Sequence, residues 1–239
     1  MKNIGRLIKV GVFSFLVGCF VNPTTVPEAN PEVPYNSERY KKIEEEKKKT
    51  VALVIVDDDG LFAYCAGVWV KSGMILTANH CVEELKTIVF YATEDDFKKK
   101  KPRMAMIASI DEDNDLALLF VDPSSEPEHD NVDMTKQPRL DIGQDVDIIG
   151  HTAGYPWSYA RGQVSAIRIG IEGPDNIKPD KVVQISAPVW MGNSGGGVFD
   201  GNGNFIGICS WISRRGPFLS FFIHKEAVEK FLVGKDIPI

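Results

Sequence analysis

Three short segments contain side chains with complementary chemistry. His80 follows an apolar run, Asp115 precedes another, and Ser194 lies within the glycine-rich segment 192–196. A serine hydroxyl is a weak nucleophile at neutral pH, and an imidazole within hydrogen-bonding distance can take its proton. A carboxylate behind the imidazole fixes its tautomer and stabilises the charge that forms. These residues predict nucleophilic acyl transfer if the fold brings them together.

The glycines around Ser194 suggest a second function for this segment. A tetrahedral acyl intermediate carries an oxyanion, and losing one backbone N–H donor to it costs about 3 kcal/mol. We predict that the N–H groups of Gly192 and Ser194 form this oxyanion hole. Gly192 suits an unusual backbone turn, and Gly195 and Gly196 permit close approach of the chain behind the nucleophile.

In the order His, Asp, Ser, these segments resemble the chymotrypsin-like serine proteases. The sequences Thr-Ala-Asn-His-Cys at 77–81, Asp-Leu-Ala-Leu at 115–118 and Gly-Asn-Ser-Gly-Gly at 192–196 are most similar to HtrA-type proteases within that clan. The resemblance covers about Thr50 to the C-terminus. It implies a serine endopeptidase for polypeptide substrates, with no cofactor and no metal. Because the chain ends at Ile239, we expect no PDZ domain of the kind most HtrA-type proteases carry.

Two other interpretations use the same residues. Gly192, Ser194 and Gly196 also match the Gly-x-Ser-x-Gly nucleophile elbow of α/β-hydrolases. That fold needs its acid and histidine after the serine, yet only His224 follows, and the glycines behind Ser194 start a helix poorly. The other alternative is a catalytically silent protease-like binding module. The complete set of catalytic residue types argues against it.

The neighbouring acids and histidines need separate interpretations. Asp111, Asp113 and Asp115 alternate as in a calcium loop, but Leu116 stands where such a loop needs glycine. We therefore predict that the first two are solvated turn residues. His151 follows a predicted strand and is interpreted as a loop residue.

The resemblance also places a substrate pocket. In the trypsin-like clan, the residue six positions before the nucleophile lies at the base of the primary pocket, which here is Pro188, or Val189 after a one-residue shift. Neither side chain can pair with a substrate Lys or Arg. We expect a small apolar pocket that accepts Val, Ala, Ile or Leu, with the substrate adding as a strand beside residues 210–212. The pocket walls are expected to include Ser210, Trp211, Ile212 and Ser220.

Three cysteines lie in the predicted domain. Cys65 and Cys81 match positions that are joined by a disulfide in the trypsin branch, and export from the cytoplasm would allow this bridge to form. HtrA relatives often lack the pair. Cys209 is then expected to be a buried free thiol.

The N-terminus resembles a bacterial lipoprotein signal. Basic residues precede an apolar run at 10–18, which is shorter than the roughly 20 residues that span a bilayer. Such a pattern is typical of a secretory signal. Leu16-Val17-Gly18-Cys19 resembles a lipobox, which implies that residues 1–18 are removed and Cys19 receives acyl chains such as palmitate. We expect an exported lipoprotein, on the outer membrane facing the periplasm or on the outer face of the plasma membrane.

Residues 19–49 are predicted to separate this anchor from the domain. Four prolines between 23 and 34 favour a semi-extended tether. Ser37–Lys49, rich in Glu and Lys, is interpreted as a charged helix or a disordered arm. The predicted protease domain spans residues 50–239.

About twelve short apolar runs alternate with turn signals after Thr50, and only His224–Val233 reads as a good helix. This pattern predicts an all-β protein. The resemblance implies two six-stranded antiparallel barrels, as in chymotrypsin, with a C-terminal helix. The apolar fraction of 44% and the charged fraction of 25% exclude a disordered chain or a multi-span membrane protein. A net charge of −6 argues against nucleic-acid binding.

Overall fold

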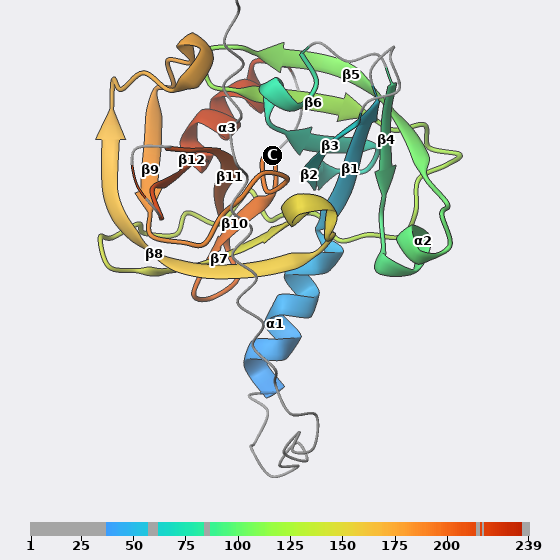
Figure 1. Ribbon diagram of the computed structural model, residues 1–239, viewed down its shortest axis with the longest axis horizontal. Helices are drawn as coiled ribbons and strands as arrows, with labels where there is room; N and C mark the ends of the chain where they lie inside the picture. The colour runs from blue at the N-terminus through green and yellow to red at the C-terminus, as the bar shows by residue number, and fades with distance from the viewer. Residues whose placement is uncertain (1–36, 57–61, 84–86, 214–215, 217, 236–239) are drawn as a thin grey trace, which may run out of the picture. The chain divides into compact units, whose positions relative to one another are not determined.

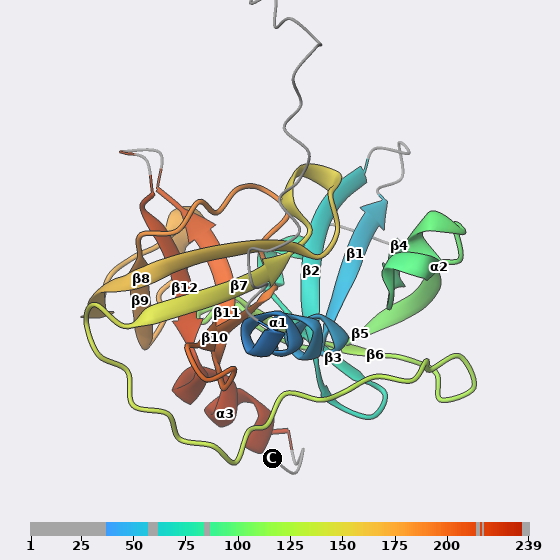
Figure 2. The same ribbon diagram turned by 90° about the horizontal axis from the view of Figure 1, so that it is seen from below.

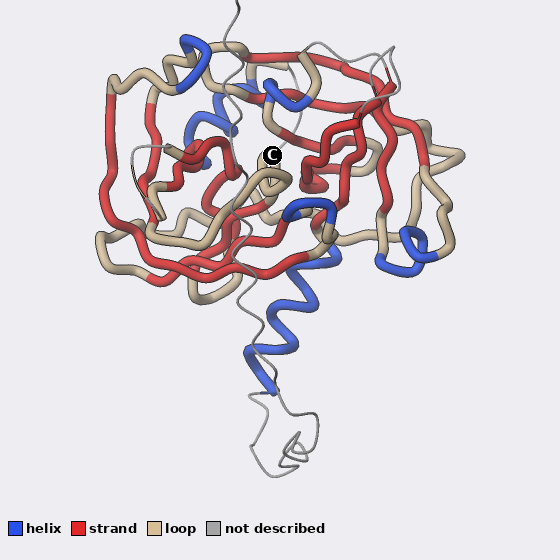
Figure 3. The backbone as a smooth tube through the Cα atoms, viewed as in Figure 1, coloured by secondary structure: helices blue, strands red, loops and turns tan. Residues whose placement is uncertain are grey.

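The computed structural model describes residues 37–56, 62–83, 87–213, 216 and 218–235. Strands dominate this part of the chain, and the helices lie around them (Figure 3). In chain order the elements are α1 (Ser37–Lys48), β1 (Thr50–Val56), β2 (Phe62–Lys71), β3 (Met74–Thr77), η1 (Asn79–Cys81), β4 (Thr87–Tyr91), α2 (Glu94–Lys98), β5 (Arg103–Asp111), β6 (Leu116–Phe120), β7 (Asp145–Gly150), η2 (Thr152–Gly154), β8 (Ser158–Ile169), η3 (Pro174–Asn176), β9 (Lys181–Ile185), β10 (Gly197–Asp200), β11 (Phe205–Ile212), β12 (Ser220–His224) and α3 (Lys225–Val233).

The strands form two closed antiparallel barrels that lie side by side (Figure 1). Barrel one has the order β1-β2-β3-β6-β5-β4, and barrel two has the order β10-β11-β12-β9-β8-β7. Helix α3 follows β12, with His224 as its N-cap, which accepts a hydrogen bond from the Glu226 N–H. The predicted all-β fold with two six-stranded barrels and a C-terminal helix is confirmed. No α/β-hydrolase sheet is present among the described residues.

Alternation of side chains along the strands divides the core into three apolar clusters. In β1, Val51, Leu53 and Ile55 point into barrel one, whereas Ala52 belongs to a cluster shared by both barrels. In β10, Val198 points into barrel two and Phe199 joins the shared cluster. Successive residues of a strand face opposite sides, so one strand can serve both clusters. The shared layer fixes the barrels against each other and therefore fixes any site between them.

Helix α1 belongs to the same compact unit as the barrels, which spans Asn36–Ile239. The charged segment is thus a helix rather than a disordered arm, and it lies inside the unit although the sequence placed the domain start near Thr50. Lys42 Nζ lies 2.5 Å from the buried Asp147 carboxylate of β7, and Lys47 reaches Glu94 of α2 at 3.3 Å. These contacts connect α1 to barrel two and to helix α2. Figure 2 views this helix nearly end-on.

Helix α2 and the lengths of the helices complete the description of the fold. The short helix α2 was not predicted; the Thr93 hydroxyl caps it by accepting a hydrogen bond from the Asp96 N–H at 3.1 Å. Among the described residues, no helix combines the length and apolar character needed to cross a membrane. The predicted signal peptide, Cys19 and the proline-rich tether lie outside the described residues.

Candidate active site

His80 lies in the one-turn helix η1, directly after β3. Two contacts with Asp115 fix its backbone: the Asn79 N–H donates to the Asp115 carbonyl at 3.1 Å, and the His80 N–H donates to Asp115 Oδ1 at 2.9 Å. The imidazole ring also points toward Asp115, with Nδ1 2.9 Å from Asp115 Oδ2. Since the carboxylate accepts, Nδ1 carries a proton.

Asp115 occupies the turn that precedes β6 and is 1% exposed. Its backbone is left-handed, with φ of +52°. The turn is held by Asp111, whose carboxylate accepts from the Asn114 N–H at 3.0 Å and from Asn114 Nδ2 at 2.9 Å. Asp111 is the last residue of β5, paired with Leu116 and half-buried, so its prediction as a solvated turn residue is wrong; Asp113 is exposed in the turn, as predicted. The Asp115 carboxylate also accepts a hydrogen bond from the Ser210 hydroxyl. This buried carboxylate therefore has three donors: the His80 N–H, His80 Nδ1 and the Ser210 hydroxyl.

Ser194 precedes β10 in barrel two, and its loop is fixed from both sides. The Ala66 N–H of β2 donates to the Ser194 carbonyl at 2.8 Å, and the Gly195 N–H donates to the Cys209 carbonyl of β11 at 2.7 Å. Ser194 Oγ donates to the Ser210 carbonyl at 3.0 Å. Ser210 therefore touches Ser194 through its backbone and Asp115 through its side chain. In this way the structure brings the three predicted catalytic residues to one place between the barrels.

The glycines of this loop adopt backbone conformations that other residues rarely use. Gly192 has φ of +97° and Gly195 has φ of +80°. A Cβ atom on Gly192 would lie 2.1 Å from the His151 carbonyl oxygen, and one on Gly195 would lie 2.1 Å from the Ala66 carbonyl oxygen. Both positions therefore require glycine. Among the described residues, no acceptor receives the N–H of Gly192 or of Ser194.

Cys65 and Cys81 are joined by a disulfide in the structure. The Cys81 sulfur lies 4.0 Å from His80 Nε2 and 3.8 Å from the Ser194 carbonyl oxygen, so the bridge adjoins both residues. Cys209 is a buried free thiol. Burial, together with the negative charge of Asp115, raises its pKa to about 12, so it stays protonated.

The predicted pocket residues come from three neighbouring segments. Ile212 pairs with Ser220 in the β11–β12 register, and Ser220 Oγ donates to the Ala187 carbonyl at 3.3 Å, next to Pro188. Val189 is buried, Pro188 is exposed, and the Trp211 ring stacks on Phe221 with centroids 5.1 Å apart. Ser210 differs from the other wall residues, because its hydroxyl points to Asp115.

His151 lies in the loop between β7 and η2, as predicted, and it is fully buried there. Its Nδ1 lies 3.1 Å from the Leu53 carbonyl oxygen and 3.2 Å from the Cys65 carbonyl oxygen. Burial lowers the pKa of this imidazole, which outweighs the opposing effect of these hydrogen bonds. The only sequence signal for burial was the strand immediately before it.

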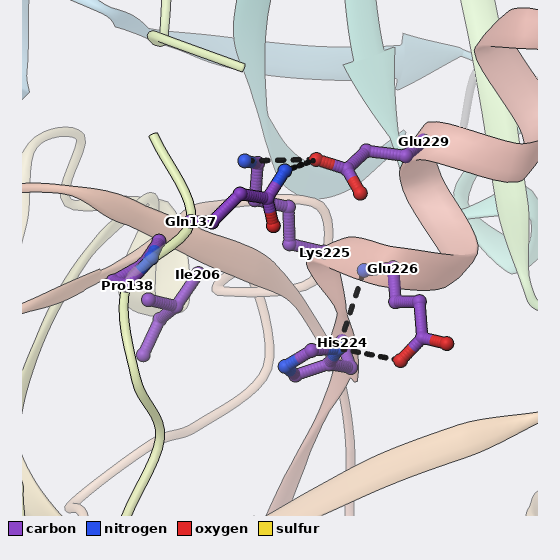
Figure 4. Close-up of a pocket in the computed structure, with 7 residues that line it drawn as sticks. All are labelled: Gln137, Pro138, Ile206, His224, Lys225, Glu226 and Glu229. Carbon is purple, nitrogen blue, oxygen red and sulfur yellow. Dashed lines mark hydrogen bonds and ion pairs between the residues drawn. The ribbon is translucent and has the colours of Figure 1, made fainter. Parts of the chain in front are cut away.

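A surface hollow at the start of α3 involves none of these residues (Figure 4). Its polar side chains already contact one another: Lys225 Nζ lies 2.9 Å from Glu229 Oε1, and Gln137 Nε2 donates to the same oxygen at 2.7 Å. Burial lowers the pKa of His224 to about 4. The hollow is lined by Gln137, Pro138, Ile206, His224, Lys225, Glu226 and Glu229.

The sequence matches a known family over the part of the chain that holds the site. A model of the trypsin-like peptidase domain matches residues 65–208. This range includes His80, Asp115 and Ser194 and makes up more than half of the chain. The chain therefore belongs to the trypsin-like peptidase family, which confirms the resemblance.

Curated relatives place it near the HtrA-type members of that family. It is 29% identical over 160 residues to Protease Do-like 5, chloroplastic, from Arabidopsis thaliana. It is 32% identical over 156 residues to a probable periplasmic serine endoprotease DegP-like from Pseudomonas putida (strain W619). Both alignments cover 64% of this chain, but only 49% and 30% of the relatives. The chain thus spans less than half of their length.

Solved structures share the fold. The Rv3671c protease from M. tuberculosis in its active form gives a TM-score of 0.71 at 20% identity, covering 83% of this chain and 85% of that one. The HtrA-type protease AlgW with tripeptide gives 0.69 at 22% identity, covering 83% and 64%.

Proposed function

We propose that this protein is a serine endopeptidase in which His80, Asp115 and Ser194 form the catalytic triad. The observation that carries the proposal is the arrangement around Ser210, whose carbonyl holds the Ser194 hydroxyl while its own hydroxyl and His80 Nδ1 both reach the Asp115 carboxylate. An imidazole, a carboxylate and a hydroxyl thus lie near one another between the two barrels, which supports the proposal. This is the constellation required for acyl transfer.

The proposed reaction proceeds in two halves. His80 Nε2 takes the proton of Ser194 Oγ as that oxygen attacks the scissile carbonyl carbon, and the carbonyl oxygen becomes an oxyanion. The N–H groups of Gly192 and Ser194 donate to this oxyanion. The imidazolium then gives its proton to the leaving amine, and an acyl-enzyme remains on Ser194. Water, activated by the same imidazole, hydrolyses this ester and restores the serine.

Hydrolysis of denatured casein by active-site variants tests the assignment. Ser194→Ala and His80→Ala should each lower kcat by at least about a thousandfold, and Asp115→Asn should be similarly severe because it favours the wrong tautomer. Ser124→Ala, an exposed serine in a turn, serves as the matched control. Covalent labelling by a serine-directed fluorophosphonate should be lost in Ser194→Ala and retained in Ser124→Ala. Wild-type hydrolysis by Ser194→Ala would overturn the assignment, and an unlabelled, inactive wild type would favour a silent binding module.

We further propose that the enzyme cuts exposed or unfolded segments after small or medium apolar residues. Pro188 and Val189 provide no charge, and Ile212 narrows the predicted entrance. A methylene in such a pocket changes the activation free energy by only about 1–3 kcal/mol, so the preference should be broad. A peptide-library profile should show Val, Ala, Ile or Leu before the cut, and Ile212→Gly should extend it to larger side chains. A profile dominated by Lys, Arg or Glu would refute this pocket assignment.

The third part of the proposal concerns location. The DegP-like relative is named as periplasmic, and the N-terminal sequence supports export with acylation of Cys19. Two or three acyl chains would give stable membrane anchoring, whereas one chain binds marginally. Mass spectrometry of the N-terminal peptide should show an acylated Cys19 as the first residue. Cys19→Ser should release the protein from the membrane fraction, while Cys209→Ser should not. An unmodified Cys19 in the wild type would contradict the proposal.

A further inference from the structure

The segment 151–154, which includes η2, contacts the backbone on which the proposed oxyanion hole depends. The Ala153 N–H donates to the Met191 carbonyl at 2.8 Å, and the His151 N–H donates to the Gly192 carbonyl at 3.0 Å. Two successive peptide groups of the nucleophile loop are therefore held by one short segment, which we call the clamp segment.

These two bonds determine where the amides point. In a trans peptide the C=O and N–H groups point in opposite directions. The peptide between Met191 and Gly192 directs its oxygen toward Ala153, so its N–H, which belongs to Gly192, points away from the clamp segment. The next peptide is fixed at both ends, because the Gly192 carbonyl accepts from His151 while the Asn193 N–H donates to the Trp190 carbonyl at 3.1 Å.

A side-chain contact adds to this backbone pairing. Thr152 Oγ1 donates to Asn193 Oδ1 at 3.0 Å, and Asn193 Nδ2 donates to the Trp190 carbonyl at 3.0 Å. Asn193 is completely buried, whereas Thr152 is half-buried. The residue directly before the nucleophile is thus fixed through a hydroxyl of the clamp segment.

The His151 ring connects the clamp segment to the other barrel. Its Nδ1 faces the carbonyl oxygens of Leu53 in β1 and Cys65 in β2, both in barrel one. Two acceptors require a donor, so Nδ1 carries the proton. Nε2 is buried without a hydrogen-bond partner in the described part of the chain. The ring packs edge-on between Tyr64, with centroids 4.8 Å apart, and Phe97, at 5.8 Å.

Ala153 shows that the clamp segment is held in an unfavourable conformation. Its φ of +49° lies in the left-handed region, which a non-glycine residue occupies only at a cost. The conformation places its N–H against the Met191 carbonyl. A strained residue persists when its surroundings fix it, and here the adjacent contacts of His151 and Thr152 fulfil that condition.

We infer that His151 and Thr152 are positioning residues for transition-state stabilisation. Through its ring, His151 fixes the clamp segment to barrel one, and through this segment it orients the Gly192 N–H; Thr152 does the same through Asn193. The inference rests on the proposed function, in which that N–H stabilises the oxyanion. His151 is fully buried and the Thr152 hydroxyl is bonded to Asn193, so we expect their effect to fall on kcat rather than on substrate binding.

Two substitutions at His151 separate hydrogen bonding from packing. His151→Asn keeps a donor at the place of Nδ1, because both nitrogens are bonded to Cγ, but it leaves space where the ring was. His151→Leu fills that space and removes the donor. We expect His151→Leu to lower kcat on denatured casein by about tenfold or more with KM within about twofold. His151→Asn should retain kcat within about threefold while having the lower melting temperature of the two.

A second pair of variants changes Thr152, which is half-buried, so both variants should fold. Thr152→Val removes the hydroxyl and keeps the shape, whereas Thr152→Ser keeps the hydroxyl. Thr152→Val should lower kcat by about fivefold without changing KM, and Thr152→Ser should restore it. A peptide aldehyde, which forms an oxyanion on Ser194, should bind Thr152→Val more weakly by the same factor.

The outcomes separate this inference from the proposed function. If Ser194→Ala remains active, the proposed function fails. If Ser194→Ala is inactive while His151→Leu and Thr152→Val keep wild-type kcat, the positioning inference alone is overturned. It is also overturned if kcat follows the melting temperature, so that His151→Asn is less active than His151→Leu.

Discussion

The Ser210 side chain contributes to the site through Asp115 rather than through the substrate pocket. The resemblance placed Ser210 on the pocket wall, because its backbone lies beside the expected substrate strand. Its hydroxyl instead donates to the Asp115 carboxylate, and Ser210 is 2% exposed. The sequence predicted that Ser210 lies in a strand, and it lies in β11. The direction of its side chain could not be predicted, because the β11–β12 register shifts between Cys209 and Trp211.

Removing this hydroxyl should weaken the orientation of His80 without removing any reacting group. A hydrogen bond to a charged acceptor contributes about 1.5 kcal/mol, which corresponds to roughly tenfold in rate. Ser210→Ala should therefore lower kcat on denatured casein about tenfold. Ser186→Ala, an exposed serine before the nucleophile loop, is the control. Unchanged kcat in Ser210→Ala would show that Asp115 needs only the two donors of His80.

The residue types of the proposed catalytic set could be predicted from the sequence, whereas the residues that we propose to support it could not. His80, Asp115 and Ser194 each lie within a short family motif, and motifs are read from sequence alone. His151 has no such motif, and its importance arises from carbonyl groups of β1 and β2 that are remote in sequence. Contacts of this kind appear only when the barrels are packed.

At the scale of elements, the docking of α1 could not be predicted from its composition. Its sequence is strongly polar, so the pattern indicated a solvated helix or a disordered arm. In the structure it docks through one network: Lys42 pairs with the buried Asp147, which also accepts from the Tyr159 hydroxyl at 2.6 Å, and Tyr159 accepts from Arg39 at 2.7 Å. Strands, by contrast, were predictable because their apolar runs alternate with turns. Helix α2 is too short for any periodicity to appear.

The Lys42–Asp147 pair should contribute to stability. Lys42→Met removes the cation 2.5 Å from the buried Asp147 and leaves it the longer contact with Arg161 Nε at 3.9 Å, so we expect the free energy of unfolding to fall by about 2–3 kcal/mol. Lys41→Met, on the exposed side of the same helix, should change it by less than about 0.5 kcal/mol. Urea denaturation followed by tryptophan fluorescence measures both. Equal effects of the two substitutions would mean that α1 does not dock through Lys42.

Glu46 of α1 should make stability depend on pH. Burial, followed by the charge of Asp147, raises its pKa from 4.5 to about 8, although Lys42 and Lys49 oppose the shift. Both carboxylate oxygens are buried and lack hydrogen-bond partners within the described residues. Between about pH 4.5 and 8 the folded state therefore keeps a proton that the unfolded state releases, so stability falls as pH rises through this window.

Glu46→Gln tests this dependence. The amide cannot ionise, so the variant should be nearly equal to the wild type in stability at pH 5 and more stable than it by roughly 3 kcal/mol at pH 8. Glu45→Gln, exposed on the same helix, is the control and should follow the wild type. If the free energies of unfolding of wild type and Glu46→Gln changed equally with pH across this range, Glu46 would not be protonated in the folded state.

At the scale of the whole molecule, the disulfide closes a loop within barrel one. Cys65 and Cys81 are 16 residues apart. A disulfide that closes a loop of this size lowers the entropy of the unfolded chain, which raises the free energy of unfolding by about 3 kcal/mol. The double variant Cys65→Ala/Cys81→Ala should be destabilised by about that amount. A reducing agent should lower the melting temperature of the wild type and leave the double variant unchanged. No effect of reductant on the wild type would indicate that the bridge is absent in solution.

Because the site is divided between the barrels, cutting the chain between them would divide the site as well. His80 and Asp115 come from barrel one and Ser194 from barrel two, and segment 122–144 connects the two barrels without contributing a strand. A cut in this segment would leave each fragment with an incomplete set of catalytic groups and an exposed apolar face. On the proposed function, neither half alone cleaves a peptide, whereas association of the halves through that face rebuilds the site. The two barrels could therefore be expressed as separate fragments, and peptide cleavage would then report that the fragments have associated.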